Sequence, residues 1–247
     1  MKSGSVVLLT ALLVVIGLVV WLCRHWLRPV PLPPQPRTVE QVVRALADPV
    51  RQRLEPAFQK AGVSYPPAQM MLRAFKAEKR IDLLAASVEG PLRPILSWPV
   101  LAASGEAGPK LREGDRQVPE GFYRIELLNP NSRFHLSLRV NYPNPDDLAR
   151  AREEGREISQ LGGDIMIHGG AASIGCLAIG DEAVEELFVL AAQTGLDAIE
   201  LVIFPGDFRA GPPPAPPDSA PAWTSDLHEA LKRELETSTN PGPGSRH

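Results

Sequence analysis

Proline is concentrated in two flanks of this chain. Of 26 prolines in 247 residues, five lie in residues 29–36 and six in residues 212–221. Proline lacks a backbone N–H and fixes φ, so proline-rich runs favour extended segments over helices and sheets. The folded part should therefore lie between them. We expect a Pro-rich spacer with short helices over residues 29–61, a single domain over residues 62–207, and a Pro-rich disordered tail over residues 208–247.

An apolar run precedes the first flank. Residues 6–23 carry no charge, and 18 residues of helix are about 27 Å long, close to the thickness of a bilayer core. The run ends in Trp21-Leu22-Cys23 without a small-residue cleavage site, so an uncleaved transmembrane helix within residues 1–28 is favoured over a signal sequence. The short basic start at Lys2 favours a cytoplasmic N-terminus and export of the rest.

Apolar periodicity predicts a mainly β domain with helices, of α+β class. Thr38 to Gln41 has the form of a capping box, which predicts a helix that Pro49 ends or restarts and that closes at Gly62. A weakly helical stretch at 227–235 has too few apolar residues to be buried. Strands are expected at about 70–75, 81–88, 98–103, 121–128, 134–140, 164–168 and 198–204, and further helices at 144–155 and 181–194.

Composition excludes several classes of function. The net charge is −3 and aromatic residues make up 6% of the chain, which argues against nucleic-acid binding. Two cysteines are too few for a disulfide framework or a Cys-rich zinc site. No metal or cofactor is therefore expected.

One thiol and one imidazole lie close together in the glycine-rich stretch GGDIMIHGGAASIGCLAIGDEA. His168 ends an apolar strand, and Cys176 follows Gly175 eight positions later. A cysteine nucleophile needs a neighbouring base or cation, and a tight glycine loop could bring the two side chains together. Asp164 could orient the imidazole only if the strand bends. From spacing alone, a lone cysteine beside apolar residues is more often a buried, inert thiol.

Together with motifs elsewhere in the sequence, this stretch makes the chain resemble the L,D-transpeptidase (YkuD-type) catalytic domain family, and most closely its YafK-like branch. The matching residues are Ile165-Met166-Ile167-His168-Gly169-Gly170, Ser173-Ile174-Gly175-Cys176, Arg73-Ala74-Phe75-Lys76, Ser104-Gly105, Gly108-Pro109-Lys110-Leu111-Arg112-Glu113-Gly114-Asp115, Pro119-Glu120-Gly121-Phe122-Tyr123, Asn129-Pro130-Asn131-Ser132 and Asn141-Tyr142-Pro143-Asn144.

The resemblance implies a β-sandwich-like domain with Cys176 as nucleophile and His168 as its base. It also implies that the Gly175 and Cys176 amides serve the oxyanion, and that Ser173 and Gly169 belong to the site loop. The implied substrate is the peptidoglycan stem peptide, attacked at the carbonyl next to diaminopimelate through a thioester. We expect basic and polar residues near the cleft to hold the anionic peptide, namely Lys110, Arg112, Arg139, His135 and Tyr142.

Ile174 stands where the broader family has a histidine, which leaves the acyl acceptor open. An amine gives transpeptidation, and water gives amidase-type hydrolysis, such as release of a wall-linked lipoprotein. A non-catalytic peptidoglycan-binding module is the remaining alternative. With the apolar N-terminal run, the resemblance implies an inner-membrane anchor and a periplasmic catalytic domain.

Overall fold

The computed structural model of the chain describes residues 18, 21 and 35–237. The expected transmembrane helix in residues 1–28 lies, apart from Leu18 and Trp21, outside the described residues. Within the part that is described, no helix is both long and apolar enough to cross a bilayer. The described residues from Pro36 onward belong to one compact unit.

Helix α2 (Val39–Ala61) opens this unit. The predicted capping box at Thr38 is confirmed, and so is the end of the helix at Gly62, which adopts the left-handed conformation. The expected break at Pro49 is wrong, because the helix continues through both Pro49 and Pro56. One buried stripe (Val42, Val50, Leu54, Phe58) packs the helix into the core and outweighs the hydrogen bonds that the prolines remove.

Eight strands form one sheet in the order β3-β2-β1-β8-β4-β5-β6-β7. Their bounds are β1 (Gln69–Phe75), β2 (Arg80–Ala86), β3 (Arg93–Pro99), β4 (Gly121–Asn129), β5 (Ser137–Val140), β6 (Met166–His168), β7 (Leu177–Ala178) and β8 (Ile199–Phe204). The predicted hairpin of β1 and β2 is confirmed by their antiparallel pairing.

The sheet curls because β4 belongs to two ladders. Its first half pairs with β8 and its second half with β5, and the register shifts between Ile125 and Leu127. The chain leaving β3 then pairs with β7: the Leu101 N–H donates to the Ala178 carbonyl at 2.8 Å, and the Ala178 N–H donates to the Ala102 carbonyl at 3.0 Å. The two ends of the sheet therefore meet, so the expected sandwich is a single curled sheet.

Two strand predictions were partly wrong. The third strand runs over Arg93–Pro99 rather than 98–103. The expected strand at 134–140 pairs only from Ser137, because His135 has a φ of 71°, which interrupts extended backbone. Phe134 is consequently exposed, instead of facing the core with Leu136 and Leu138.

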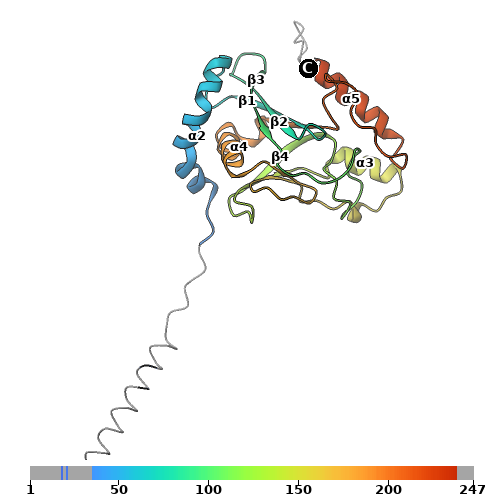
Figure 1. Cartoon of the computed structure of the whole chain (residues 1–247), viewed down its shortest axis with the longest axis horizontal. Helices are drawn as coiled ribbons and strands as arrows, with labels where there is room; N and C mark the ends of the chain where they lie inside the picture. Colours follow the sequence, from blue (N-terminus) through green and yellow to red (C-terminus); the bar gives the residue numbers. More distant parts are fainter. Residues whose placement is uncertain (1–17, 19–20, 22–34, 238–247) are drawn as a thin grey trace, which may run out of the picture. The chain divides into compact units, whose positions relative to one another are not determined.

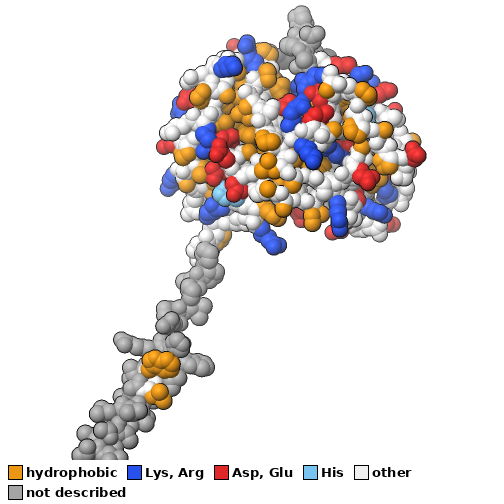
Figure 2. Space-filling model, in the orientation of Figure 1, with side chains coloured by type: hydrophobic (Ala, Val, Ile, Leu, Met, Phe, Trp, Pro, Cys, Tyr) orange, Lys and Arg blue, Asp and Glu red, His pale blue; other side chains and the backbone are white. Residues whose placement is uncertain are grey.

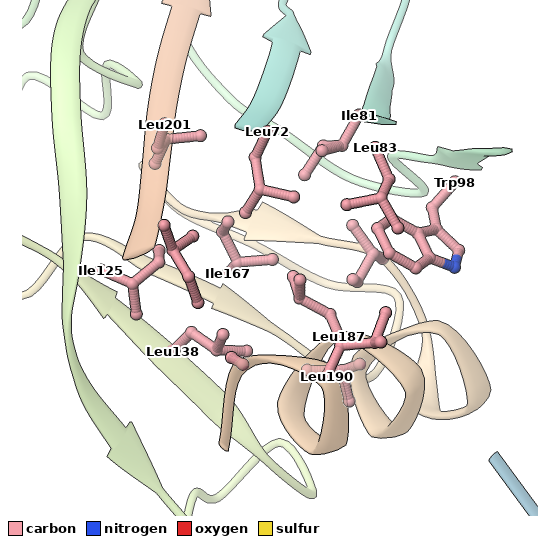
Figure 3. Close-up of a cluster of buried hydrophobic side chains, with 14 of the residues drawn as sticks. Leu72, Ile81, Leu83, Trp98, Ile125, Leu138, Ile167, Leu187, Leu190 and Leu201 are labelled. Carbon is pink, nitrogen blue, oxygen red and sulfur yellow. The ribbon is translucent and has the colours of Figure 1, made fainter. Parts of the chain in front are cut away.

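Helices cover both faces of the sheet and complete an α+β fold. Helix α4 (Asp181–Thr194) lies between α2 and the sheet (Figure 1), and its Leu187 and Leu190 point toward Leu72, Leu138 and other strand residues (Figure 3). Helix α3 (Pro145–Glu153) starts at a capping box on Asn144. Short 3₁₀ turns lie at Ile158–Gln160 and Leu196–Ala198.

The C-terminal flank contains helix α5 (Trp223–Thr237), and the expectation that this stretch has too few apolar residues to be buried is wrong. Leu227, Leu231 and Leu235 are buried on the other face of the sheet, against Phe75, Val202 and Phe204. On the face shown in Figure 2, basic and acidic side chains are interspersed, without a large patch of one sign.

Candidate active site

Strand pairing brings the predicted nucleophile and base to one edge of the sheet. Strand β6 ends at His168, and β7 runs parallel to it, with Ile167 opposite Leu177 and His168 opposite Ala178. Cys176 immediately precedes β7, so it lies one strand away from β6 and near its start. The intervening loop starts at Gly169, where there is no room for a side chain, since a Cβ would come within 2.6 Å of Asp181 Oδ1 and of the Phe134 carbonyl oxygen.

The His168 imidazole is buried and held on two sides. Its Nδ1 lies 2.6 Å from the Gly169 carbonyl oxygen. A carbonyl can only accept, so Nδ1 carries the proton and Nε2 is the acceptor of the neutral ring. The Phe134 ring stacks on the imidazole with centroids 4.6 Å apart. Asp164 does not orient the ring: its side chain is exposed and lies 3.9 Å from Arg139 Nη1.

The Cys176 thiol is partly buried, and its Sγ donates to the Asp164 carbonyl at 3.7 Å. Burial raises the pKa of this thiol, and the Asp164 carboxylate raises it further. The Met166 backbone and the Lys110 charge lower it by less. Among the described residues no hydrogen bond joins Sγ to the imidazole. The raised pKa favours the neutral thiol, whose hydrogen-bond acceptor is the Asp164 carbonyl.

Two serine hydroxyls bind the amides expected to serve an oxyanion. Ser173 Oγ accepts from the Cys176 N–H at 3.0 Å and donates to the Cys176 carbonyl at 2.7 Å. Gly175 has a φ of 84°, and its N–H donates to Ser104 Oγ at 2.6 Å. The oxyanion role of both amides stays a prediction, because a substrate oxygen would have to replace these hydroxyls.

Three of the expected substrate-binding residues contact one another. Lys110 is buried, and its Nζ binds Asp115 Oδ1 at 2.7 Å and the Arg112 carbonyl at 2.8 Å. The Arg112 side chain is exposed. Tyr142 is buried, and its hydroxyl lies 3.3 Å from the Lys110 carbonyl and 3.5 Å from that of Leu161. Tyr142 therefore packs as a residue of the hydrophobic core.

The other two expected residues contact glutamate side chains. Arg139 Nε lies 2.6 Å from Glu126 Oε1, close in distance although the atoms are not aligned as a hydrogen bond. His135 Nε2 lies 2.8 Å from Glu185 Oε1 of α4. Contact of either residue with a substrate stays a prediction.

Arg116 has its backbone beside the turn before Cys176, and the sequence analysis did not single it out. Its Cα lies 3.8 Å from the position that a Cβ on Gly175 would take. Its φ is 59° and its side chain is exposed, with no ionic partner among the described residues. Its position directly after the motif that ends at Asp115 was the available signal. Within the described residues no cluster of three His, Cys, Asp or Glu side chains could hold a metal ion.

Known proteins are similar in sequence to the part of the chain that contains this site. Residues 83–201 match the L,D-transpeptidase catalytic domain family (YkuD). The Escherichia coli K12 protein named "Putative L,D-transpeptidase YafK" is 32% identical over 139 residues, which are 54% of this chain and 53% of that protein. The chain thus spans about half the length of this relative.

Solved structures with similarity to the chain include two proteins. The helical cell shape determining protein Pgp2 of Campylobacter jejuni has a TM-score of 0.45 and 21% identity, over 56% of this chain and 48% of its own. L,D-transpeptidase 1 of Mycobacterium tuberculosis has a TM-score of 0.31 and 11% identity, over 55% and 61%. With Cys176 and His168 both inside the matched residues 83–201, the resemblance of this chain to the L,D-transpeptidase catalytic domain family is confirmed.

Proposed function

We propose that this chain is a cysteine acyl transferase of the bacterial cell wall that acts on peptidoglycan stem peptides at the carbonyl next to diaminopimelate. The observation that carries the proposal is the parallel pairing of β6 with β7, which sets Cys176 beside the strand that ends in His168. The imidazole there has its Nδ1 proton bound to a carbonyl, and this leaves Nε2 to act as the base.

The reaction follows from these groups. Sγ turns from the Asp164 carbonyl and attacks the amide carbon while its proton passes to His168 Nε2. The C–N bond then breaks, the leaving amine takes that proton, and a thioester remains on Cys176. An incoming amine or water attacks the thioester and gives its proton to Nε2, the C–S bond breaks, and the released Sγ takes that proton back. An amine acceptor makes a cross-link, and water makes a hydrolysed stem peptide.

Defined muropeptides incubated with the purified full chain test this proposal. We expect new products by chromatography and an acyl adduct on Cys176 by mass spectrometry. Cys176→Ala should abolish both, and His168→Ala should lower turnover by about 10²-fold or more. Full activity in the Cys176→Ala variant would remove the assignment. Addition of a free amine identifies the acceptor, because a transpeptidase incorporates the amine and a hydrolase does not.

The place of action is a second part of the proposal. The charge-free residues 6–23 support an inner-membrane anchor, and a wall substrate requires the catalytic domain in the periplasm. Protease added to intact spheroplasts should then digest the chain beyond residue 30. A core that survives until the membrane is broken would place the domain on the cytoplasmic side and out of contact with peptidoglycan.

A further inference from the structure

A hydroxyl from a distant segment holds the turn that carries the candidate nucleophile. Ser104 lies just after the residues that join the β3 segment to β7. Its Oγ accepts from the Gly175 N–H at 2.6 Å across 71 positions of sequence, and donates to the Arg116 carbonyl at 2.8 Å. The hydroxyl thus links three segments: its own, the loop at residue 116 and the turn before Cys176.

The turn at Gly175 also packs against the backbone of residues 116 and 117. Gly175 is in the left-handed region, with a φ of 84°, and a Cβ there would lie 3.6 Å from the Gln117 carbonyl oxygen. Gln117 is itself held by two hydrogen bonds. The Gln117 side-chain oxygen accepts from the Glu106 N–H at 3.0 Å, and the Gln117 N–H donates to Asp115 Oδ1 at 3.0 Å. These two bonds tie Gln117, which follows the Arg116 carbonyl that Ser104 binds, to neighbouring segments.

We propose that Ser104 is a positioning residue, which fixes the Gly175 turn and thereby the place of the Cys176 sulfur. The proposal rests on the proposed function only in taking Cys176 as the nucleophile. Ser104 touches neither the sulfur nor the base and acts through the Gly175 amide. Without its hydroxyl, that amide loses its protein partner, and a glycine regains wide conformational freedom. A displacement of about 1 Å at a reacting group can cost up to about 10²-fold in rate.

Three variants test the proposal by turnover. Ser104→Ala removes the hydroxyl, Ser104→Thr keeps it, and Ser97→Ala is the matched control, because the Ser97 hydroxyl binds Asp82 at 2.6 Å on exposed β3. We expect kcat to fall by about 10- to 100-fold in Ser104→Ala with KM within about twofold, since positioning acts on the chemical step. Ser104→Thr should retain most of the wild-type kcat, and Ser97→Ala should match the wild type.

A measurement without substrate separates this proposal from the proposed function. Hydrogen exchange of the Gly175 amide, followed by NMR on the full chain, should be slow in the wild type and at least about 10-fold faster in Ser104→Ala. It should be unchanged in Ser97→Ala, and the melting temperature should stay within a few degrees. If the wild type has no turnover, the proposed function fails, and the exchange data alone decide the role of Ser104.

Two results would overturn the positioning role. One is an unprotected Gly175 amide in the wild type, or the same exchange rate in the wild type and in Ser104→Ala. The other is turnover by Ser104→Ala that equals or exceeds the wild type. Faster turnover would mean that the Ser104 hydroxyl occupies an amide that the developing oxyanion needs.

Discussion

At the scale of single residues, the Cys176 thiol rests in surroundings that disfavour its ionised form. Burial raises its pKa most, and the Asp164 carboxylate adds to the effect. We therefore expect slow alkylation by iodoacetamide at neutral pH, with a rate that keeps rising to higher pH than for the same residue in the urea-unfolded chain. Mass spectrometry of the peptide that contains Cys176 measures the modification.

Asp164→Asn gives this prediction a directional control. The change removes the carboxylate charge and keeps a residue that tolerates the φ of 53° at this position. The alkylation curve of the variant should move to lower pH. Rapid alkylation of the wild type near pH 6 would instead show a thiolate already formed in the resting protein, and would contradict the neutral thiol described above.

Individual residues of the site differed in how well the sequence predicted them. His168 and Cys176 were identified through a compact motif, and the left-handed Gly175 follows from the turn that the motif requires. Ser104 was quoted as part of a motif, but its bond to the Gly175 amide joins residues 71 positions apart, and no local spacing encodes such a contact. The burial of Tyr142 was missed for the same reason, because its partners come from other segments.

At the scale of elements, helix α5 is tied to the sheet by apolar and charged contacts. Its leucines pack on β8, and His228 Nε2 lies 2.7 Å from the buried Glu120 carboxylate, which also accepts from Lys76 Nζ at 2.7 Å. Burial works to raise the pKa of Glu120, but the bonds to His228 and Lys76 lower it below its ordinary value. The helix is therefore part of the folded domain.

Leu231→Ala should show how much α5 contributes. Leu231 is fully buried, and truncation of a buried leucine typically costs about 2–5 kcal/mol of unfolding free energy. Lys232→Ala is the control, since Lys232 is exposed and its one ion pair within residues 35–237 is with Glu236 at 4.0 Å. Urea unfolding should give a clearly lower midpoint for Leu231→Ala and an unchanged one for Lys232→Ala. Equal midpoints would mean that α5 does not stabilise the domain.

Predictions of elements from the sequence succeeded where periodicity or caps are strong. The capping boxes at Thr38 and Asn144 mark real helix starts. The burial of helix α5 was underestimated because three leucines, viewed alone, form a small apolar surface. They suffice here because they recur every four residues and so lie on one side of the helix. The apolar sheet face that they meet is built from two strands, β1 and β8, and cannot be predicted from the pattern of either strand alone.

At the scale of the whole molecule, the curled sheet joins the chain after β3 to the strand that follows the nucleophile. The strand order starts at β3 and ends at β7, and the bridge between Ala102 and Ala178 joins these two ends of the sheet. The sequence predicted a β-rich domain but missed this closure. A two-residue strand such as β7 has no periodicity to detect, and one of its two pairing partners is a segment more than 70 positions away. The position of Cys176 thus depends on tertiary structure.

Leu101→Pro tests whether closure of the sheet holds the nucleophile in place. The change removes the Leu101 N–H that donates to the Ala178 carbonyl at 2.8 Å, one residue beyond Leu177 and two beyond Cys176. Loss of one such bond should lower the unfolding free energy by about 1 kcal/mol or more. It should also speed alkylation of Cys176 at high pH, because a loosened β7 exposes the thiol.

Leu101→Ala is the matched control, since it keeps the N–H and trims a half-exposed side chain. It should leave both measurements near wild type, and equal effects of the two variants would assign the result to the side chain instead of closure.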